Sequence, residues 1–155
     1  MLEAAEKERK EMAAKDAQEA EEQMVAKKEP KDLYLEAYEI YKKGETREAR
    51  ERFESLIKEH PKNEYSSRAH FWIGESYYKE KKYESAILAY EDYLRENPKG
   101  EKTPEALLKQ GYSFYAIGDA RIGKVILEKL IRKFPNSSEA EMAKKRLGET
   151  TKKKR

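Results

Sequence analysis

The 155-residue chain contains no cysteine, little glycine and proline, and no long apolar run. The absence of cysteine excludes disulfides, thiolate nucleophiles and thiolate metal ligands. Seven glycines and five prolines are too few for a turn-rich β fold and favour helices. No stretch approaches the roughly 18 apolar residues that a membrane-spanning helix requires. We therefore expect an all-α protein without direct membrane insertion.

The charge of the chain is high but evenly balanced. Charged residues make up 42% of the sequence and apolar residues 37%, a balance typical of an extended helical assembly or of disorder. Eleven Tyr, four Phe and one Trp argue against disorder over most of the length. Residues 1–30 hold nine acidic and six basic residues, whereas residues 144–155 hold seven basic and one acidic. Because the segment between them is neutral, we expect no nucleic-acid partner.

The sequence repeats with a period of 37 residues. The positions that recur include a proline, a glycine and a tyrosine: Pro61, Pro98 and Pro135; Gly74, Gly111 and Gly148; Tyr41, Tyr78 and Tyr115. Such a period indicates stacked supersecondary units, each of which needs its neighbours to bury an apolar face. Internal repetition is therefore the main feature from which the fold can be predicted.

Each repeat reads as two helices joined by a short turn. Glycines at 44 and 118 make two of these turns, and Thr46 and Asp119 are the expected N-caps of the helices that follow. Thr103 is the expected N-cap of another helix, with Pro104 at its first position. Small residues should let paired helices approach closely, which predicts that Gly74 lies opposite Ala86 and Gly111 opposite Gly123.

This arrangement matches the tetratricopeptide repeat (TPR), a helix–turn–helix unit with a usual period of about 34 residues. The three extra residues fall between repeats. We expect a right-handed TPR superhelix over residues 31–148, preceded by a charged helical extension, residues 1–30, and followed by a basic tail, residues 149–155. Its expected parts are repeats at about 31–63, 66–99 and 103–136 and a capping helix at 137–148.

Two segments narrow the resemblance within the TPR class. Trp72–Tyr78 and Tyr83–Ile87, together with the ending Ala143–Gly148, resemble the C-terminal domain of the periplasmic tol-pal system protein family YbgF, also called CpoB. The resemblance covers about residues 31–148. It implies an adaptor that works with TolA-like envelope proteins and helps coordinate cell division with envelope constriction.

The same resemblance leaves other assignments open. Outer-membrane assembly lipoproteins of the BamD type share the period and similar motifs, and a regulatory TPR domain of a larger enzyme is a third alternative. Family members of the YbgF type carry a signal peptide and a trimerising coiled coil. Residues 1–30 show neither, since Arg9 and Asp16 interrupt the only apolar seam. We therefore expect a fragment that begins in the linker, and a homo-oligomer only in a full-length protein.

No residue pattern predicts catalysis. His60 precedes a helix-ending proline, and His70 shares its register with Leu33 and Leu107, which predicts packing between helices. No phosphate loop, HExxH motif or EF-hand spacing occurs. We expect a protein that is not an enzyme, with no cofactor and no metal site.

The expected site is the concave surface formed by the first helix of each repeat. Tyrosine combines a large rigid ring with a polar tip and suits the binding of a peptide or helical segment. The positions expected on this surface are Tyr34, Tyr38, Tyr41, Arg68, Phe71, Glu75, Tyr78, Lys79, Glu105, Leu108, Tyr112 and Tyr115. Tyr77, Tyr90 and Tyr93 are instead expected to pack between repeats. The tail Lys152–Arg155 reads as a solvated tail, a contact for anionic lipid or nucleic acid, or an artificial chain end.

Overall fold

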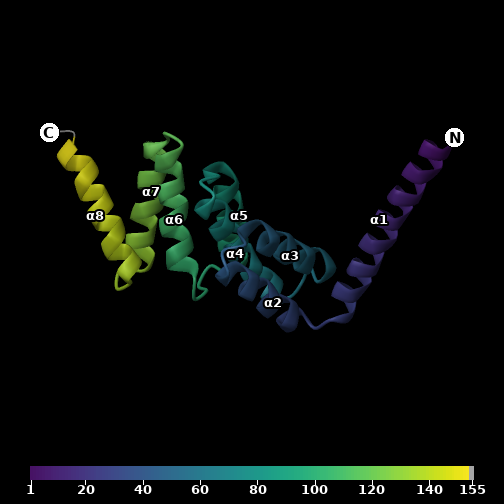
Figure 1. Cartoon of the computed structure of the whole chain (residues 1–155). Coiled ribbons are helices and arrows are strands. Elements are labelled where there is room, and N and C mark those ends of the chain that lie inside the picture. The colour runs from purple at the N-terminus through teal and green to yellow at the C-terminus, as the bar shows by residue number, and fades with distance from the viewer. Residues whose placement is uncertain (154–155) are drawn as a thin grey trace.

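A computed structural model describes residues 1–153, apart from the side chains of residues 25, 26 and 150–153. Within this range the chain forms helices and no strand (Figure 1). The helices are α1 (Leu2–Lys27), α2 (Pro30–Lys42), α3 (Thr46–Glu59), α4 (Glu64–Lys79), α5 (Tyr83–Glu96), α6 (Thr103–Ala116), α7 (Ala120–Lys133) and α8 (Ser138–Lys153). The prediction of an all-α solenoid is confirmed.

The helices stack as pairs along a curved array. The pairs α2/α3, α4/α5 and α6/α7 follow one another, and α8 covers the last pair (Figure 1). At the other end α1 packs on α3, where the Lys58 Nζ lies 3.4 Å from Glu22 Oε1, while its N-terminal part projects away. Almost every described residue of α1 is exposed, as expected for a helix without an apolar face.

The turn inside each repeat has the same backbone geometry at 37-residue intervals. Gly44 and Gly118 adopt φ values of +87° and +86°, in the left-handed region that glycine enters at little cost. The equivalent residue in the middle repeat is Lys81, with φ +61°. The middle turn therefore places a side chain in a conformation that L-residues rarely adopt.

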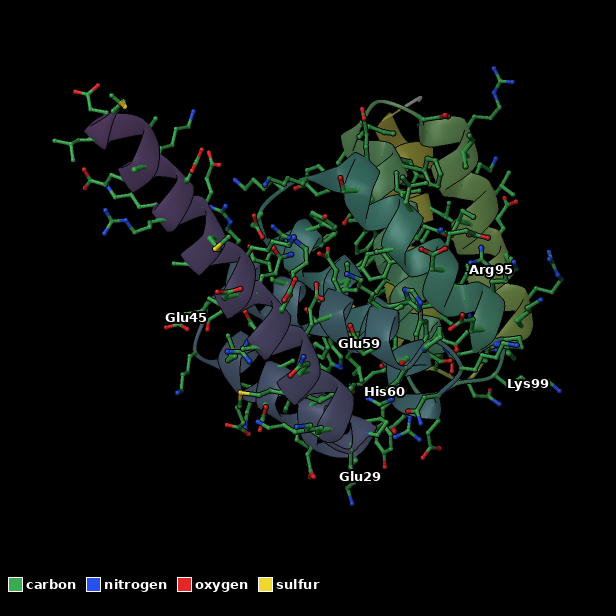
Figure 2. The ribbon with its side chains drawn as sticks, turned by 90° about the vertical axis from the view of Figure 1, so that its right-hand side faces the viewer. Glu29, Glu45, Glu59, His60, Arg95 and Lys99 are labelled. Atoms are coloured by element: carbon green, nitrogen blue, oxygen red, sulfur yellow. The ribbon has the colours of Figure 1, made fainter. Side chains whose placement is uncertain are left out.

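The turn between repeats also recurs. Ser66 Oγ donates a hydrogen bond of 2.5 Å to the His60 carbonyl, and Thr103 Oγ1 donates one of 2.5 Å to the Asn97 carbonyl, 37 residues later. His60 and Lys99 mark two of these turns in Figure 2. A side-chain hydroxyl thus satisfies a carbonyl just beyond the end of each second helix.

Three apolar clusters form the core, and each spans the boundary between neighbouring repeats. Phe53 and Leu56 lie at the centre of the first cluster, Tyr90 of the second, and Leu127 and Leu130 of the third; all five are 0% exposed. Solenoids lack one central core because each repeat contacts only its neighbours.

Glycine allows close helix approach at two contacts between paired helices. A Cβ atom on Gly123 would lie 3.0 Å from the Gly111 carbonyl oxygen, so these two glycines do face each other. A Cβ on Gly74 would lie 2.6 Å from the Tyr90 ring. Tyr90 therefore fills the space that Gly74 leaves, as Leu127, 37 residues later, does at Gly111.

Two of the predicted N-caps are wrong. Helix α3 begins at Thr46 with Glu45 as N-cap, and α6 begins at Thr103 with Lys102 as N-cap. The Thr103 hydroxyl is committed to the Asn97 carbonyl and so does not cap its own helix. Asp119 does cap α7, accepting a hydrogen bond of 3.3 Å from the Ile122 amide.

Helix α8 extends further than the predicted capping helix. It continues through Lys153, so part of the segment expected as a basic tail is helical. The side chains of Lys152 and Lys153, and all of Lys154 and Arg155, lie outside what the structure describes.

Candidate functional site

The first helices α2, α4 and α6, continued by α8, pack against one another along one side of the solenoid. We call this side the concave surface. The partly buried aromatic residues on it are Tyr38 and Tyr41 on α2, Trp72 and Tyr78 on α4, and Tyr112 and Tyr115 on α6. Partial burial holds each ring in place and leaves part of it accessible, which suits contact with a partner.

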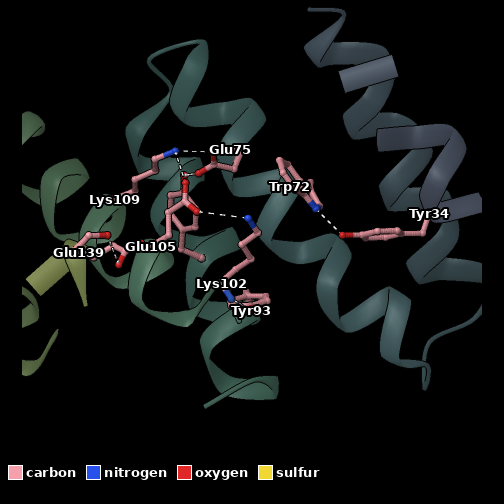
Figure 3. A network of polar contacts seen from close by, with 10 residues as sticks. Tyr34, Trp72, Glu75, Tyr93, Lys102, Glu105, Lys109 and Glu139 are labelled. Carbon is pink, nitrogen blue, oxygen red and sulfur yellow. Dashed lines mark hydrogen bonds and ion pairs between the residues drawn. The ribbon is translucent and has the colours of Figure 1, made fainter. Parts of the chain in front are cut away.

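Trp72 organises the aromatic group between α2 and α4. Its ring centroid lies 4.8 Å from that of Tyr38 and 5.1 Å from that of Tyr41. Its indole Nε1 donates a hydrogen bond of 2.7 Å to the Tyr34 hydroxyl, drawn as a dashed line in Figure 3. Trp72 is not among the residues predicted on this surface, because the equivalent positions in the other repeats are Leu35 and Lys109 and show no aromatic repetition.

Basic side chains lie over several of these rings at distances typical of cation–π contacts. The contacts, measured to ring centroids, are Lys42 on Tyr38 (5.1 Å), Lys79 on Tyr41 (5.6 Å), Lys102 on Trp72 (5.7 Å), Lys109 on Tyr78 (5.5 Å) and Arg146 on Tyr115 (4.6 Å). The concave surface is therefore both aromatic and rich in cations.

A buried polar cluster lies beneath the middle of the concave surface (Figure 3). The Glu75 carboxylate accepts a 2.7 Å hydrogen bond from the Tyr90 hydroxyl and one of 2.6 Å from Lys109 Nζ, which also lies 3.3 Å from Glu105. Burial works to lower the pKa of Lys109, but Glu75 and Glu105 outweigh it and raise that pKa overall. Burial beside Glu75 raises the pKa of Tyr90, so its hydroxyl stays protonated and donates.

This cluster links α4, α5 and α6 by hydrogen bonds, and Lys109 neutralises the charge of Glu75. The structure therefore gives Glu75 an internal role in place of the predicted contact with a partner. Lys102 extends the cluster, since its Nζ lies 3.9 Å from Glu105 and its backbone N–H donates to the Tyr93 hydroxyl at 3.1 Å.

At the C-terminal end the concave surface deepens into a hollow of about 520 Å³. Its walls come from Tyr78 on α4, from Tyr112 and Tyr115 on α6, and from α8, with Met142 and Lys145 among the α8 residues. Burial raises the pKa of Tyr112 and of Tyr78, so both phenols remain neutral hydrogen-bonding groups near neutral pH. The hollow combines aromatic walls, a flexible thioether and cations, a suitable lining for a peptide segment.

Two residues predicted on the concave surface belong to the core instead. Phe71 is 1% exposed and Leu108 is 3% exposed. Both share the register of Tyr34, but Tyr34 lies in the first repeat, whereas neighbouring repeats cover the same position further along. Phe71, for example, lies in one core cluster with Ala106 of α6, in the next repeat.

The remaining predicted positions lie at the surface or support it. Arg68 is exposed, 3.8 Å from Glu64, and lies over the Tyr65 ring at 5.3 Å. Lys79 is exposed, and its Nζ lies over the Tyr41 ring at 5.6 Å. Tyr34 is held by Trp72, and burial raises its pKa.

The histidines lie away from the concave surface. The His70 imidazole is 17% exposed, with Nε2 3.8 Å from Glu96. In the part of the chain that the structure describes, no group of three or more histidine, aspartate or glutamate side chains could hold a metal ion. Over the same residues, no helix is long and apolar enough to cross a membrane.

Solved structures confirm the class of protein. The first TPR of Spaghetti (RPAP3), bound to an HSP90 peptide, is 17% identical with a TM-score of 0.66, and the match covers 79% of this chain and 92% of that one. The C-terminal TPR-containing domain of a Plasmodium falciparum protein described as FK506-binding is 20% identical with a TM-score of 0.58, covering 83% and 99%. These likenesses show that the fold is a TPR solenoid.

The family follows from the sequence. The family model YfiO, outer membrane lipoprotein, matches residues 26–153, and the chain therefore belongs to this family. No individual curated protein matches the chain in sequence. The comparisons do not confirm the resemblance to the YbgF family.

Proposed function

We propose that the protein is a non-enzymatic adaptor of the bacterial cell envelope, which holds a segment of a partner protein on its concave surface. The observation that carries the proposal is the row of partly buried rings on α2, α4 and α6, from Tyr38 to Tyr115, with cations lying over them. Rigid aromatic residues flanked by cations are typical of binding hot spots.

The membership of the YfiO family supports a place at the outer membrane. Of the alternatives that the sequence left open, it favours a component of outer-membrane assembly, of the BamD type. The likeness to a TPR that binds an HSP90 peptide supports an extended or helical peptide as the bound form of the partner. Work with the Tol-Pal system, TolA-like partners and a role in cell division remain a second proposal, which rests on the resemblance of Trp72–Tyr78 to the YbgF family.

The proposal is tested by affinity capture from a bacterial envelope extract. Wild-type protein should retain a defined set of envelope proteins, and Tyr38→Ala and Tyr112→Ala should each weaken that retention by about tenfold or more. Val125→Ala is the matched control, because Val125 lies on the second helix α7, is 57% exposed and does not lie on the concave surface.

Two results would count against the proposal. One is unchanged retention by both tyrosine variants, with helical circular dichroism like that of the wild type. The other is an equal loss in Val125→Ala, which would place binding on the second helices. Identification of the retained proteins then decides between outer-membrane assembly and the Tol-Pal system.

A further inference from the structure

A second hollow, of about 360 Å³, lies on the opposite side of the solenoid, where α3, α4 and α5 meet. We call it the convex hollow. Its floor is apolar and includes Ile57 on α3 and Ile73 and Tyr77 on α4. Leu88 on α5 stands at its edge with 68% of its surface exposed. The apolar floor and the exposed leucine together offer an apolar contact surface.

Carboxylates stand on both sides of the convex hollow. Glu54 belongs to α3 and Asp92 to α5. Asp92 makes an exposed ion pair with Arg95, at 2.8 Å, which water and salt weaken. Burial raises the pKa of Glu54 more than the nearby Arg50 charge lowers it, and among the described residues the Glu54 carboxylate makes no hydrogen bond or ion pair. Glu54 is exposed, so its negative charge stands beside the hollow without a direct ion-pair partner among the described residues.

At the next repeat boundary, the carboxylate equivalent to Glu54 has a hydrogen-bond donor within the chain. Glu91 stands 37 residues after Glu54, and Gln110 stands 37 residues after Ile73. Gln110 Nε2 donates hydrogen bonds of 2.9 Å to Glu91 and 3.3 Å to the Ile87 carbonyl. At the first boundary Ile73 offers no such donor, so the exposed Glu54 carboxylate is open to a cationic donor from a partner protein.

We propose that the convex hollow binds a positively charged amphipathic segment of a partner protein, with an apolar side chain on the floor and a lysine or arginine paired with Glu54. Charge complementarity selects this occupant, since an acidic segment or an anionic lipid surface would be repelled by Glu54 and Asp92. This site is separate from the concave surface and does not depend on the function proposed for that surface.

The test is a titration of the ¹⁵N-labelled full chain with a short amidated peptide of alternating leucine and lysine, followed by NMR. The amide signals of Ile57, Ile73 and Leu88 should shift in a saturable way. The same peptide with glutamate in place of lysine should shift them little. Absence of saturable shifts at the convex hollow, or equal binding of the two peptides there, would overturn the proposal.

Variants then test separately whether the Glu54 charge and the apolar floor contribute to peptide binding. Glu54→Gln should weaken binding of the lysine peptide by about three- to fivefold, the scale of one partly exposed ion pair. Glu51→Gln is the matched control on the same helix, outside the hollow, and should leave the affinity unchanged. Ser85→Tyr, which places a ring in the hollow, should abolish the shifts. If Glu54→Gln binds as well as Glu51→Gln, or if Ser85→Tyr binds like the wild type while folded, the assignment is wrong.

Discussion

The indole N–H of Trp72 donates a 2.7 Å hydrogen bond to the hydroxyl of Tyr34, and this bond joins the first helices of two successive repeats. Because Tyr38 and Tyr41 pack against the same indole ring, the bond also fixes the aromatic group of the concave surface. The surface that we propose binds a partner is thus part of what holds the repeats together.

Tyr34→Phe should lower the free energy of unfolding by about 1 kcal/mol, because it leaves the Trp72 indole N–H without its acceptor. Tyr38→Phe is the control, since the Tyr38 hydroxyl makes no hydrogen bond within the described residues, and its effect should be close to zero. Urea denaturation of both variants measures the difference. Equal effects would show that the bond contributes nothing to stability.

Glycine-to-alanine substitutions should destabilise the protein at one position and stabilise it at another. Gly123→Ala should destabilise by about 1–3 kcal/mol, because the new Cβ would lie 2.8 Å from the Tyr115 ring and 3.0 Å from the Gly111 carbonyl. Gly148→Ala should stabilise by up to about 1 kcal/mol, since nothing lies within 4 Å and alanine favours helix. Thermal unfolding of both variants checks this, and a stabilising Gly123→Ala would contradict the close approach of α6 and α7.

Lys81→Gly should stabilise the protein by about 0.5–1 kcal/mol despite the greater freedom of glycine in the unfolded chain. The reason is that Lys81 adopts φ +61° where the other repeats have glycine. The reverse change, Gly118→Ala, should destabilise by about 1 kcal/mol, and it introduces no clash, because nothing lies within 4 Å. Chemical denaturation measures both, and a destabilising Lys81→Gly would refute the left-handed turn in the middle repeat.

The ion pair between Arg50 and Glu80 should make stability depend on pH. Arg50, whose side chain is 9% exposed, donates hydrogen bonds to Glu80 and lowers the pKa of that carboxyl below its ordinary value, more than burial raises it. A lowered folded-state pKa adds stability above the ordinary value of 4.5, and this stability is lost as the pH falls through the folded-state pKa.

Glu80→Gln should therefore lower the free energy of unfolding by about 2 kcal/mol at pH 7, since it leaves Arg50 buried without its carboxylate. The difference from wild type should shrink at pH values below 4.5, where the wild-type carboxyl becomes protonated. Glu51→Gln, which removes only an exposed pair with Arg47, should change little at either pH. A difference that stays constant from pH 7 to pH 3 would contradict the linkage.

The architecture could be predicted from sequence because repetition multiplies the signal. Pro61, Pro98 and Pro135 fix the register, and the same 37-residue spacing reappears in the positive φ angles at Gly44, Lys81 and Gly118. Lys81 shows the limit of this reasoning, since the turn kept its shape although the residue type that favours it is missing.

The concave surface was less predictable, because helical spacing gives the direction of a side chain but not what covers it. Phe71 and Leu108 point toward the same side as Tyr34, yet neighbouring repeats bury them. Trp72 could not be predicted because the equivalent residues in the other repeats are Leu35 and Lys109, which are not aromatic. Its place on the surface follows from contacts between helices, which a sequence pattern does not show. The N-cap of α6 could not be predicted from residue type, because the Thr103 hydroxyl bonds to the Asn97 carbonyl instead of capping its own helix.

Site-specific photocrosslinking in bacterial cells tests the central claim most directly. A photoreactive phenylalanine derivative would replace Tyr38 or Tyr112 on the concave surface and, as the control, Val125 on α7. Our account predicts that both concave positions form a crosslink to the same envelope protein and that Val125 does not. Crosslinks from Val125 alone, or none from either concave position in a folded protein, would contradict it.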